Sequence, residues 1–258
     1  MEFKKKYGQN FLRDKNIIKK IVESTKDLNI KNIIEVGPGD GALTEFILKI
    51  YENVKIIEID DDLIPLLENK FSQKNLEIIN KDILDIEINK MFKDSYQVIA
   101  NLPYYISSKI IFKFLKDNNC KALTIMLQKE LVDRMTSNND SKTYGRLTVA
   151  VNTFFDTNKI LDVNRKLFTP QPDVDSSVIQ LERKKEKLIE KENIDSYLNF
   201  VKISFAMKRK TIYNNLKKYY KNDVLEKSLH NILGDDYKHK RSENISINDF
   251  VKLFDKLN

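Results

Sequence analysis

Short hydrophobic runs recur through the first two thirds of the chain and predict the strands of a buried sheet. Five of these runs have apolar residues on both faces of the predicted strand: 33–36, 54–59, 76–79, 98–100 and 122–127. Strands that are apolar on both faces are typical of a parallel sheet whose two faces are covered by helices. Segments such as 42–49 and 63–71, which stand between the runs, have the spacing of helices. The pattern therefore predicts an α/β fold with a parallel sheet.

Later segments predict how the sheet ends and where a second domain begins. Residues 158–163 and 177–182 have the pattern of two more strands around a proline-containing loop, which would add an antiparallel edge. Residues 184–192 form a charge-dense linker, and the rest of the chain shows only helical periods. We therefore expect a first domain over residues 1–183 and a small all-helical domain over residues 184–258.

The composition excludes several classes of protein. The chain has 258 residues, of which 41% are hydrophobic and 32% are charged, so a sizeable core can form and wholesale disorder is excluded. No run of 18 apolar residues occurs, and residues 1–13 are basic without a continuous apolar stretch, so we expect neither a membrane span nor a secretory signal. Cys120 is the only cysteine, and His230 and His239 lie far from it in the sequence. These counts speak against a disulfide scaffold or a Cys/His metal site and favour a reducing, cytoplasmic location.

The basic excess is concentrated in two stretches. Lys and Arg number 45 against 38 Asp and Glu, a net charge of +7. One stretch, 201–221, holds seven basic residues and no acidic one: Lys202, Lys208, Arg209, Lys210, Lys217, Lys218 and Lys221. The other stretch, residues 1–20, has two acidic residues, Glu2 and Asp14. Its basic residues are Lys4, Lys5, Lys6, Arg13, Lys15, Lys19 and Lys20. Such clustering indicates a phosphate-bearing partner, although a solvated lysine-rich surface would look the same on charge alone.

A glycine-rich segment directly follows the first predicted strand. Its sequence is Glu35-Val-Gly37-Pro-Gly39-Asp-Gly41, and a helical segment begins right after it. A backbone without side chains can approach a ligand closely at this place, and a helix start offers amide donors. The segment could also be only a tight turn, or could hold a nicotinamide or flavin dinucleotide. Alone, it indicates a cofactor site without identifying the cofactor.

Polar residues at the ends of the next three strands sharpen this prediction. Glu58 ends the second run, Asp82 follows the third and Asn101 follows the fourth. Because the carboxyl ends of parallel strands line one crevice, these side chains and Gly37 should meet around one ligand. Glu58 can accept hydrogen bonds from both hydroxyls of a ribose, and Asp82 can accept one from an adenine amino group. Either acid alone would more simply be a helix cap or a surface charge.

The tetrapeptide Asn101-Leu102-Pro103-Tyr104 has the groups that an aromatic amine needs in order to react. Adenine N6 is a poor nucleophile because its lone pair is delocalised into the ring. The Asn101 side-chain oxygen, with the backbone carbonyl of Leu102 or Pro103, can accept both N6 hydrogens and stabilise the charge that develops on the nitrogen. Proline stiffens the loop, and Tyr104 can stack on the base. The alternative is a plain turn with a buried aromatic residue.

Together with two further segments, these motifs resemble a known family. The segments are Tyr7-Gly-Gln-Asn-Phe-Leu12 and Phe168-Thr-Pro-Gln-Pro-Asp-Val-Asp-Ser176. Nearly end to end, the chain is similar to the S-adenosylmethionine-dependent rRNA adenine N6,N6-dimethyltransferases. The resemblance implies a Rossmann-like class I methyltransferase sheet followed by the small helical domain.

Within that family, the C-terminal part resembles the small-subunit branch, the KsgA or RsmA type. The segments that carry this resemblance are Lys208-Arg-Lys-Thr211 and the tail Arg241-Ser-Glu-Asn-Ile-Ser246. The Erm resistance methylases, which modify the large subunit, are less similar here. One departure is that Lys208 stands where an arginine is common, which would soften a bidentate phosphate contact.

The resemblance also implies roles for individual residues. Cofactor contacts would come from Asn10, Leu12, Gly37, Gly39, Glu58, Asp82 and Asn101. The target base would be held by Asn101, Leu102, Pro103, Tyr104 and Phe168. Phe168 would face Tyr104 across the adenine ring, although Phe168 could equally be core beside a proline-rich turn. The segment around Asn10 would be a flap over the cofactor, and Lys208, Arg209 and Lys210 would hold RNA phosphates.

The activity so implied is methylation of N6 on two adjacent adenines in the hairpin loop near the 3′ end of small-subunit rRNA, within an immature 30S particle. The target base must be unpaired or flipped out, because pairing hides N6. A monomer without metal or membrane contact suffices. The alternatives are an Erm-type large-subunit methylase, a mainly non-catalytic RNA-binding assembly or transcription factor, and a dinucleotide oxidoreductase, which would leave the Asn101–Tyr104 loop unexplained.

Overall fold

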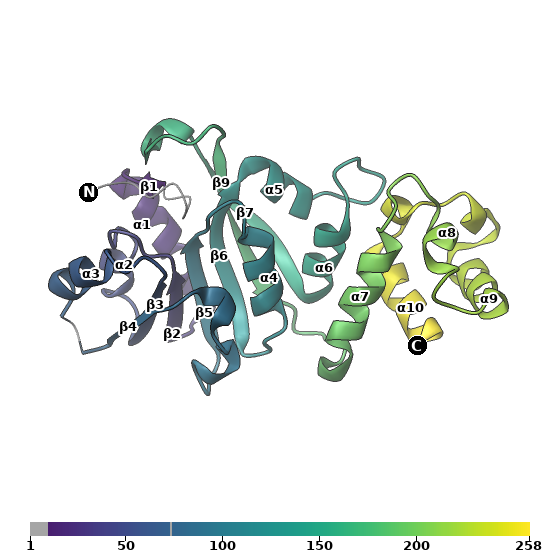
Figure 1. Ribbon diagram of the computed structural model, residues 1–258, viewed down its shortest axis with the longest axis horizontal. Helices are drawn as coiled ribbons and strands as arrows, with labels where there is room; N and C mark the ends of the chain where they lie inside the picture. The colour runs from purple at the N-terminus through teal and green to yellow at the C-terminus, as the bar shows by residue number, and fades with distance from the viewer. Residues whose placement is uncertain (1–9, 73) are drawn as a thin grey trace. The chain divides into compact units, whose positions relative to one another are not determined.

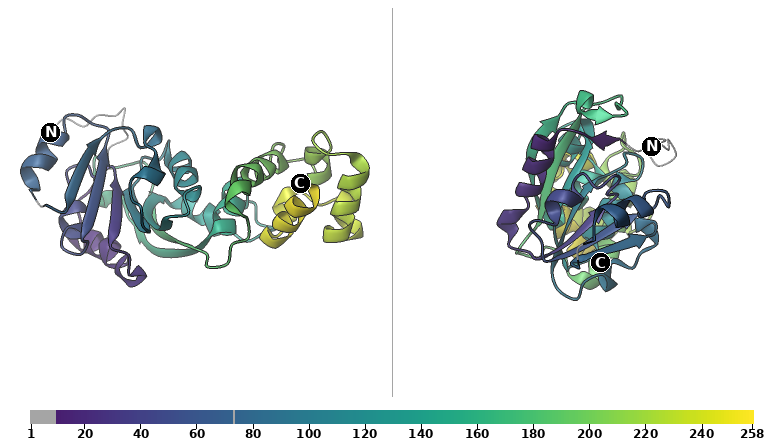
Figure 2. Two further views of the ribbon diagram at one scale, coloured as in Figure 1. Left: turned by 90° about the horizontal axis from the view of Figure 1, so that it is seen from below. Right: turned by 90° about the vertical axis from the view of Figure 1, so that its left-hand side faces the viewer.

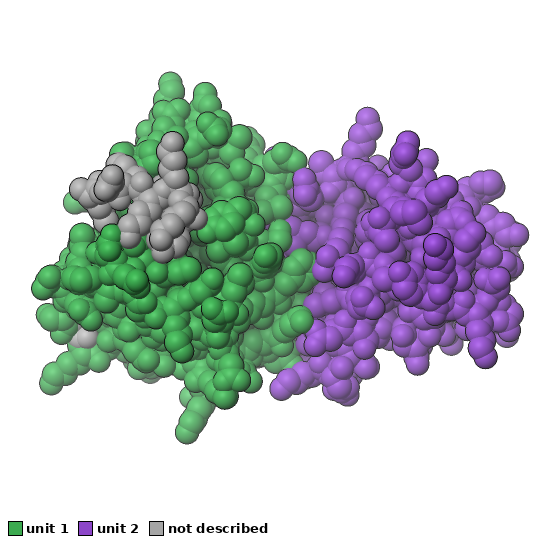
Figure 3. Space-filling view, viewed as in Figure 1, with its two compact units in different colours: residues 1–132, 157–183 green, residues 133–156, 184–258 purple. Residues whose placement is uncertain are grey.

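The computed structural model describes all residues except 1–9 and 73, and the chain divides into two compact units (Figures 1 and 3). The units comprise residues 1–132 with 157–183, and residues 133–156 with 184–258. The boundary after Arg183 lies where the sequence pattern places it. Residues 133–156 belong to the C-terminal unit, so the division differs from the expected one, 1–183 and 184–258, by this segment.

This segment joins the second unit because helix α6 (Arg146–Phe154) completes the core of that unit. The Thr153 hydroxyl and the Tyr197 hydroxyl lie 2.8 Å apart and share a hydrogen bond. The rings of Phe154 and Tyr197 pack edge to face, with centroids 6.0 Å apart. Tyr197 is fully buried. The apolar face of α6 therefore finds its partner 44 residues later in the chain, which local periodicity cannot show.

The first unit is built on a seven-stranded sheet with the order β4-β3-β2-β5-β6-β9-β7. Its strands are β2 (Asn32–Val36), β3 (Asn53–Glu58), β4 (Leu76–Asn80), β5 (Tyr96–Asn101), β6 (Cys120–Gln128), β7 (Phe155–Val163) and β9 (Ser176–Arg183). Strands β2 to β6 pair in parallel, and β9 pairs antiparallel with β6. The predicted α/β sheet with an antiparallel strand is confirmed.

The strand order creates a crevice at the carboxyl ends of β2 and β5. The chain first steps from β2 outward to β3 and β4, and then returns to place β5 on the other side of β2. Right-handed crossovers that run in opposite directions put their helices on opposite faces, and helices cover both faces of the sheet (Figures 1 and 2). Open sheets of this kind bind ligands where the strand order reverses.

The helices of this part of the chain bury apolar side chains. They are α1 (Lys15–Glu23), α2 (Thr44–Ile47), α3 (Ile64–Lys70), α4 (Ser107–Leu115) and α5 (Lys129–Met135). Helix α1 begins after Asp14 because the Asp14 side chain accepts hydrogen bonds from the amides of Asn16 and Ile17. Helices α1 and α2 share one apolar core with β2 and β3, whereas α4 packs against β6.

A two-stranded ribbon outside the main sheet holds the start of the described chain. Strand β1 (Phe11–Leu12) pairs antiparallel with β8 (Phe168–Thr169), with Leu12 opposite Phe168. Phe11, Leu12 and Phe168 are all buried. The sequence pattern does not predict this ribbon, because strands of two residues leave no periodic signal.

Helices dominate the second unit. Besides α6 they are α7 (Ile194–Ser204), α8 (Ile212–Leu216), α9 (Asn222–Leu233) and α10 (Ile247–Leu257). Aromatic rings fill the core: Tyr197 and Phe254 pack edge to face with centroids 5.3 Å apart, and Phe200 and Phe250 do so at 6.3 Å. The helical character predicted for the C-terminal part is confirmed. Across the described residues of both units, the helices are too short or too polar to cross a bilayer.

Candidate active site

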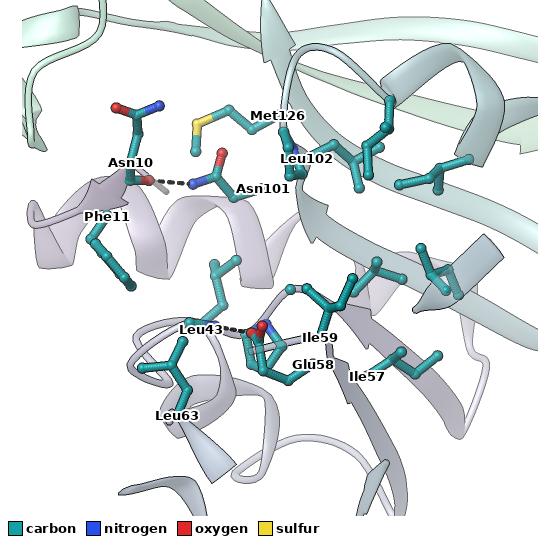
Figure 4. A pocket seen from close by; sticks show the side chains of 18 of the residues that line it. Asn10, Phe11, Leu43, Ile57, Glu58, Ile59, Leu63, Asn101, Leu102 and Met126 are labelled. Carbon is teal, nitrogen blue, oxygen red and sulfur yellow. Dashed lines mark hydrogen bonds between the residues drawn. The ribbon is translucent and has the colours of Figure 1, made fainter. Parts of the chain in front are cut away.

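A cavity opens at the carboxyl ends of β2, β3, β4 and β5, within the first unit (Figure 4). Its lining includes these residues singled out from the sequence: Asn10, Leu12, Gly37, Gly39, Glu58, Asp82, Asn101, Leu102, Pro103 and Tyr104. Apolar side chains such as Leu43, Leu63 and Met126 complete the wall. The sheet topology thus brings the four strand ends around one hollow.

The glycine loop needs glycine for conformation and for space. Gly37, Gly39 and Gly41 all have positive φ angles, of 68°, 60° and 79°, which L side chains rarely adopt. The Gly37 amide donates to the Ile57 carbonyl at 2.9 Å and ties the loop to β3. A Cβ atom on Gly39 would lie only 2.7 Å from Cε1 of Phe11. Bare backbone therefore faces the cavity, and the N-terminal segment lies directly against it.

Glu58 is fixed by the main chain and keeps the capacity to bind a ligand. Its side chain is 5% exposed, and its two oxygens accept hydrogen bonds from the amides of Gly39 at 3.2 Å and Asp60 at 2.9 Å. Burial raises the pKa of this carboxyl, and the hydrogen bonds from Asp60 and Gly39 oppose that rise. Because a carboxylate has about four lone-pair sites, Glu58 can still accept a hydrogen bond from a ligand.

Asp82 caps a short turn at the end of β4. Its Oδ1 accepts a hydrogen bond from the Leu84 amide at 2.8 Å, which leaves Oδ2 as the second acceptor of the carboxylate. Ile59 and Ile83, which directly follow Glu58 and Asp82, also line the cavity, and Ile59 is 39% exposed. Sequence reasoning missed these two side chains. The sequence did contain a signal for them, because an apolar residue directly follows each carboxylate. Such a side chain can pack against the face of a flat ring.

The Asn101 side chain is held in one orientation by the N-terminal segment. Its Nδ2 donates to the backbone carbonyl of Asn10 at 2.8 Å (Figure 4). The donor end of the carboxamide is therefore engaged by the protein itself. The oxygen is left as the end that can accept a hydrogen bond from a ligand.

Hydrogen bonds distinguish the two backbone carbonyls that the sequence left open. The Pro103 carbonyl accepts from the Ile106 amide at 3.3 Å and from the Ser107 hydroxyl at 2.8 Å. A carbonyl oxygen has two lone pairs, so these two donors use both lone pairs of the Pro103 oxygen. The Leu102 carbonyl is therefore the better acceptor for a second N6 hydrogen.

Tyr104 and Phe168, the two rings of the clamp considered from the sequence, lie in different surroundings. Tyr104 lines the cavity, and its hydroxyl shares a hydrogen bond with the Ser176 hydroxyl at 2.8 Å. Phe168 is 4% exposed, lies opposite Leu12 in the β1–β8 ribbon and packs in the apolar core. It does not contribute to the cavity wall. The structure places Phe168 as core, the second of the two interpretations.

Comparison with known proteins places the chain in a family. The model of the family described as ribosomal RNA adenine dimethylase matches residues 1–258. The chain belongs to this family. The small subunit methyltransferase A of Mycoplasmopsis pulmonis is 42% identical to it over 98% of both chains. The protein of the same name from Bacillus licheniformis is 39% identical over 99% of this chain and 91% of its own.

Two solved structures have the same fold as this chain. A dimethyladenosine transferase from Plasmodium falciparum is 31% identical with a TM-score of 0.77, over 94% of this chain and 95% of its own. The 23S rRNA methyltransferase ErmE is 27% identical with a TM-score of 0.70, over 96% and 99%. The resemblance inferred from the motifs is confirmed, as are the Rossmann-like methyltransferase fold and the rRNA adenine methyltransferase activity.

The basic residues expected to bind RNA lie in the second unit. Lys208, Arg209 and Lys210 are exposed in the loop between α7 and α8. The Lys208 ammonium donates to the backbone carbonyl of Lys142 at 3.1 Å, which joins this loop to the segment before α6. The N-terminal residues Lys4, Lys5, Lys6, Tyr7, Gly8 and Gln9 lie outside the described residues. In the described ranges, no group of three or more His, Cys, Asp or Glu is arranged to hold a metal ion.

Glu35 is a second feature that sequence reasoning missed. This carboxyl is completely buried at the end of β2, and its Oε2 accepts a hydrogen bond from the Thr44 hydroxyl at 2.6 Å. Its Oε1 has no hydrogen-bond partner among the described residues. Burial raises the pKa of Glu35 to about 8, and the Thr44 hydrogen bond opposes the rise. An acidic residue inside an otherwise apolar strand was the available signal.

Proposed function

We propose that this protein is a small-subunit rRNA adenine N6,N6-dimethyltransferase. It transfers methyl groups from S-adenosylmethionine to two adjacent adenines in the 3′-terminal hairpin loop of 16S rRNA, within an immature 30S particle. The observation that carries this proposal is the position of Asn101. Its carboxamide lies in the same cavity as Glu58 and the glycine loop, with its nitrogen held by the Asn10 carbonyl.

The hydrogen-bond acceptors and apolar side chains that line the cavity support S-adenosylmethionine as its ligand. Glu58 would accept hydrogen bonds from the two ribose hydroxyls, and Asp82 would accept one from the adenine amino group. Ile59 and Ile83 would contact the faces of the adenine of the cofactor. The backbone of the glycine loop would contact the remainder of the cofactor. When bound, the cofactor supplies a methyl group on a positively charged sulfonium.

The residues of the chain orient the target adenine for attack. Asn101 Oδ1 and the Leu102 carbonyl would accept the two N6 hydrogens and aim the lone pair at the methyl carbon. Transfer of the methyl group would leave a neutral thioether on the cofactor and positive charge on N6, and these two oxygens would stabilise that charge. The N6 proton leaves to water after attack, so positioning and charge stabilisation supply most of the acceleration.

The sole cysteine has no part in this chemistry. Cys120 is buried in β6, and burial raises the pKa of its thiol to about 12. A thiol of this kind is a poor nucleophile at neutral pH because the thiolate is the reactive form. The transfer therefore goes directly to the base rather than through a covalent enzyme intermediate.

The relatives favour the small-subunit branch over the large-subunit one. The proteins named ribosomal RNA small subunit methyltransferase A are 42% and 39% identical to this chain, whereas ErmE is 27% identical. The complete set of Gly37, Glu58, Asp82 and Asn101 in one cavity speaks for catalysis rather than for an inactive assembly factor. With ribosomal precursors as its partner, the protein would act in the cytoplasm, as a monomer.

The proposal is tested by offering the purified protein S-adenosylmethionine with immature small subunits or with large-subunit rRNA. Mass spectrometry and primer extension should show dimethylation of two adjacent adenines in small-subunit rRNA only. Modification of large-subunit rRNA alone would overturn the subunit assignment. Cofactor binding without methylation of either RNA would instead support a non-catalytic RNA-binding role.

A further inference from the structure

The two successive tyrosines in the loop after β5 differ in what they can do. Tyr104 is half-buried and its hydroxyl is tied to Ser176. Tyr105 also lines the cavity but is 64% exposed, more than any other large hydrophobic side chain that is described. Of the other exposed members of this group, only Ile59 lines the cavity. A large aromatic face is thus presented at the rim of the candidate active site.

The loop that carries Tyr105 is firmly held on both sides. The Leu102 amide donates to the Met126 carbonyl at 3.2 Å. The Pro103 carbonyl accepts from Ile106 and Ser107 at the start of α4. The main chain around Tyr105 is therefore held in place, and a partner would have to order only the side chain. An exposed aromatic ring on a firmly held main chain is the kind of platform on which unpaired bases stack.

A base next to the target adenine needs a new stacking partner when the target adenine enters the cavity. When a base leaves its stack to enter a pocket, the neighbouring base loses one of its stacking partners. We propose that Tyr105 stacks on the nucleotide next to the target adenine and so positions the RNA strand at the cavity mouth. This inference rests on the proposed function, because it assumes an adenine in a single-stranded loop as substrate.

Substitution of Tyr105 tests the stacking directly. Tyr105→Ala should raise the KM for a hairpin-loop RNA by about 5- to 150-fold, the usual range for loss of one base–aromatic stack. The kcat and the affinity for S-adenosylmethionine should stay unchanged, since Asn101, Glu58 and Asp82 remain. Tyr105→Phe should keep the wild-type KM and Tyr105→Leu should not. Leu66→Ala is a matched control, because Leu66 is 37% exposed in the same unit and does not line the cavity.

A fluorescent base gives a readout that a merely structural role would not move. With 2-aminopurine on the 5′ or 3′ side of the target adenine, binding of the wild-type protein should quench emission at one of the two positions. Tyr105→Ala should leave that probe bright at saturating protein. Equal quenching by both proteins, or an unchanged KM in Tyr105→Ala, would overturn the role of Tyr105 while wild-type methylation continues. Absence of methylation by the wild-type protein would instead refute the proposed function itself.

Discussion

The cavity of the first unit and the basic loop of the second unit differ in how firmly their side chains are held. In the cavity, Glu58 is 5% exposed and Asn101 is held by a main-chain carbonyl, so each side chain has one orientation. In the loop between α7 and α8, Lys208, Arg209 and Lys210 are exposed. A fixed polar group acts through geometry and loses most of its effect when it is displaced. Exposed charges act through their number, and each contributes a similar share.

The largest effect should follow from removal of the Asn101 carboxamide. Asn101→Ala should lower kcat by about 10²- to 10³-fold, the usual loss for one preorganised group that stabilises developing charge. The affinity for RNA should stay near its wild-type value, because we expect exposed lysines and arginines to supply most of it. Single-turnover methylation and filter binding measure the two quantities. Near-normal turnover would show that fixed geometry at the end of β5 does not carry the reaction.

Asn101→Asp separates the two ends of the carboxamide. The carboxylate keeps an acceptor for N6 but loses the donor to the Asn10 carbonyl, which lies 2.8 Å from Nδ2. An oxygen in that place would repel the carbonyl. We therefore expect kcat to fall in this variant as well. Wild-type turnover in Asn101→Asp would show that the Asn10 contact is not needed to orient the side chain.

A large effect on stability should come from the buried carboxyl at the end of β2. The pKa of Glu35 is raised from 4.5 to about 8 in the folded protein. A raised folded-state pKa means that stability is fully present below pH 4.5 and is lost progressively as the pH rises toward 8. The cost at pH 8 would reach a few kcal/mol, since one pKa unit corresponds to about 1.4 kcal/mol.

Glu35→Gln should remove this dependence on pH. The amide keeps a hydrogen-bonding group opposite Thr44 but does not ionise, so the variant should gain stability relative to wild type as the pH rises from 5 to 8. Thermal or urea unfolding of the cofactor-free protein across this range measures the difference. Parallel pH profiles for the two proteins would contradict the assignment of a buried, neutral carboxyl at Glu35.

The basic loop should show a graded effect instead. Removing a side chain that binds one phosphate lowers the slope of log K against log salt by roughly 0.7 to 0.9. Between 50 and 200 mM salt, the RNA affinity of both proteins should fall. For the triple variant Lys208→Ala, Arg209→Ala, Lys210→Ala, the factor by which it falls should be about 20 to 40 times smaller than for wild type. The three single variants should each give about a third of the change in slope. One dominant single variant would show that this loop also depends on fixed geometry.

Most of the sheet and the cavity could be predicted because topology turns local patterns into positions. Runs with apolar residues on both faces, such as 54–59, indicate buried parallel strands, and their carboxyl ends must share one edge. Glu58, Asp82 and Asn101 follow from that rule without any knowledge of their contacts. No comparable rule applies to the helices of the second unit. There the sequence indicates where charge is concentrated but not which side chains face a partner.

The features that were missed depend on contacts between distant parts of the chain. The face that Phe168 presents is set by its pairing with Leu12, 156 positions earlier. Residues 133–156 join the helical unit through the contact of α6 with Tyr197. The preference for the Leu102 carbonyl emerges only when the donors to Pro103 are known. None of these contacts leaves a periodic signal in the sequence.

The smallest effect should come from the ion pair that ties the N-terminal segment to the glycine loop. Arg13 forms an ion pair with Asp40, and its guanidinium lies 5.2 Å from the centre of the Phe11 ring. An exposed pair contributes about 0.2 to 1 kcal/mol, so Arg13→Ala should weaken S-adenosylmethionine binding by roughly 1.4- to 5-fold. Lys19→Ala breaks the surface pair with Glu23 on α1, away from the cavity, and should not change cofactor affinity. Equal effects of both substitutions in calorimetry would mean that Arg13 acts only through net charge, as the basic loop does.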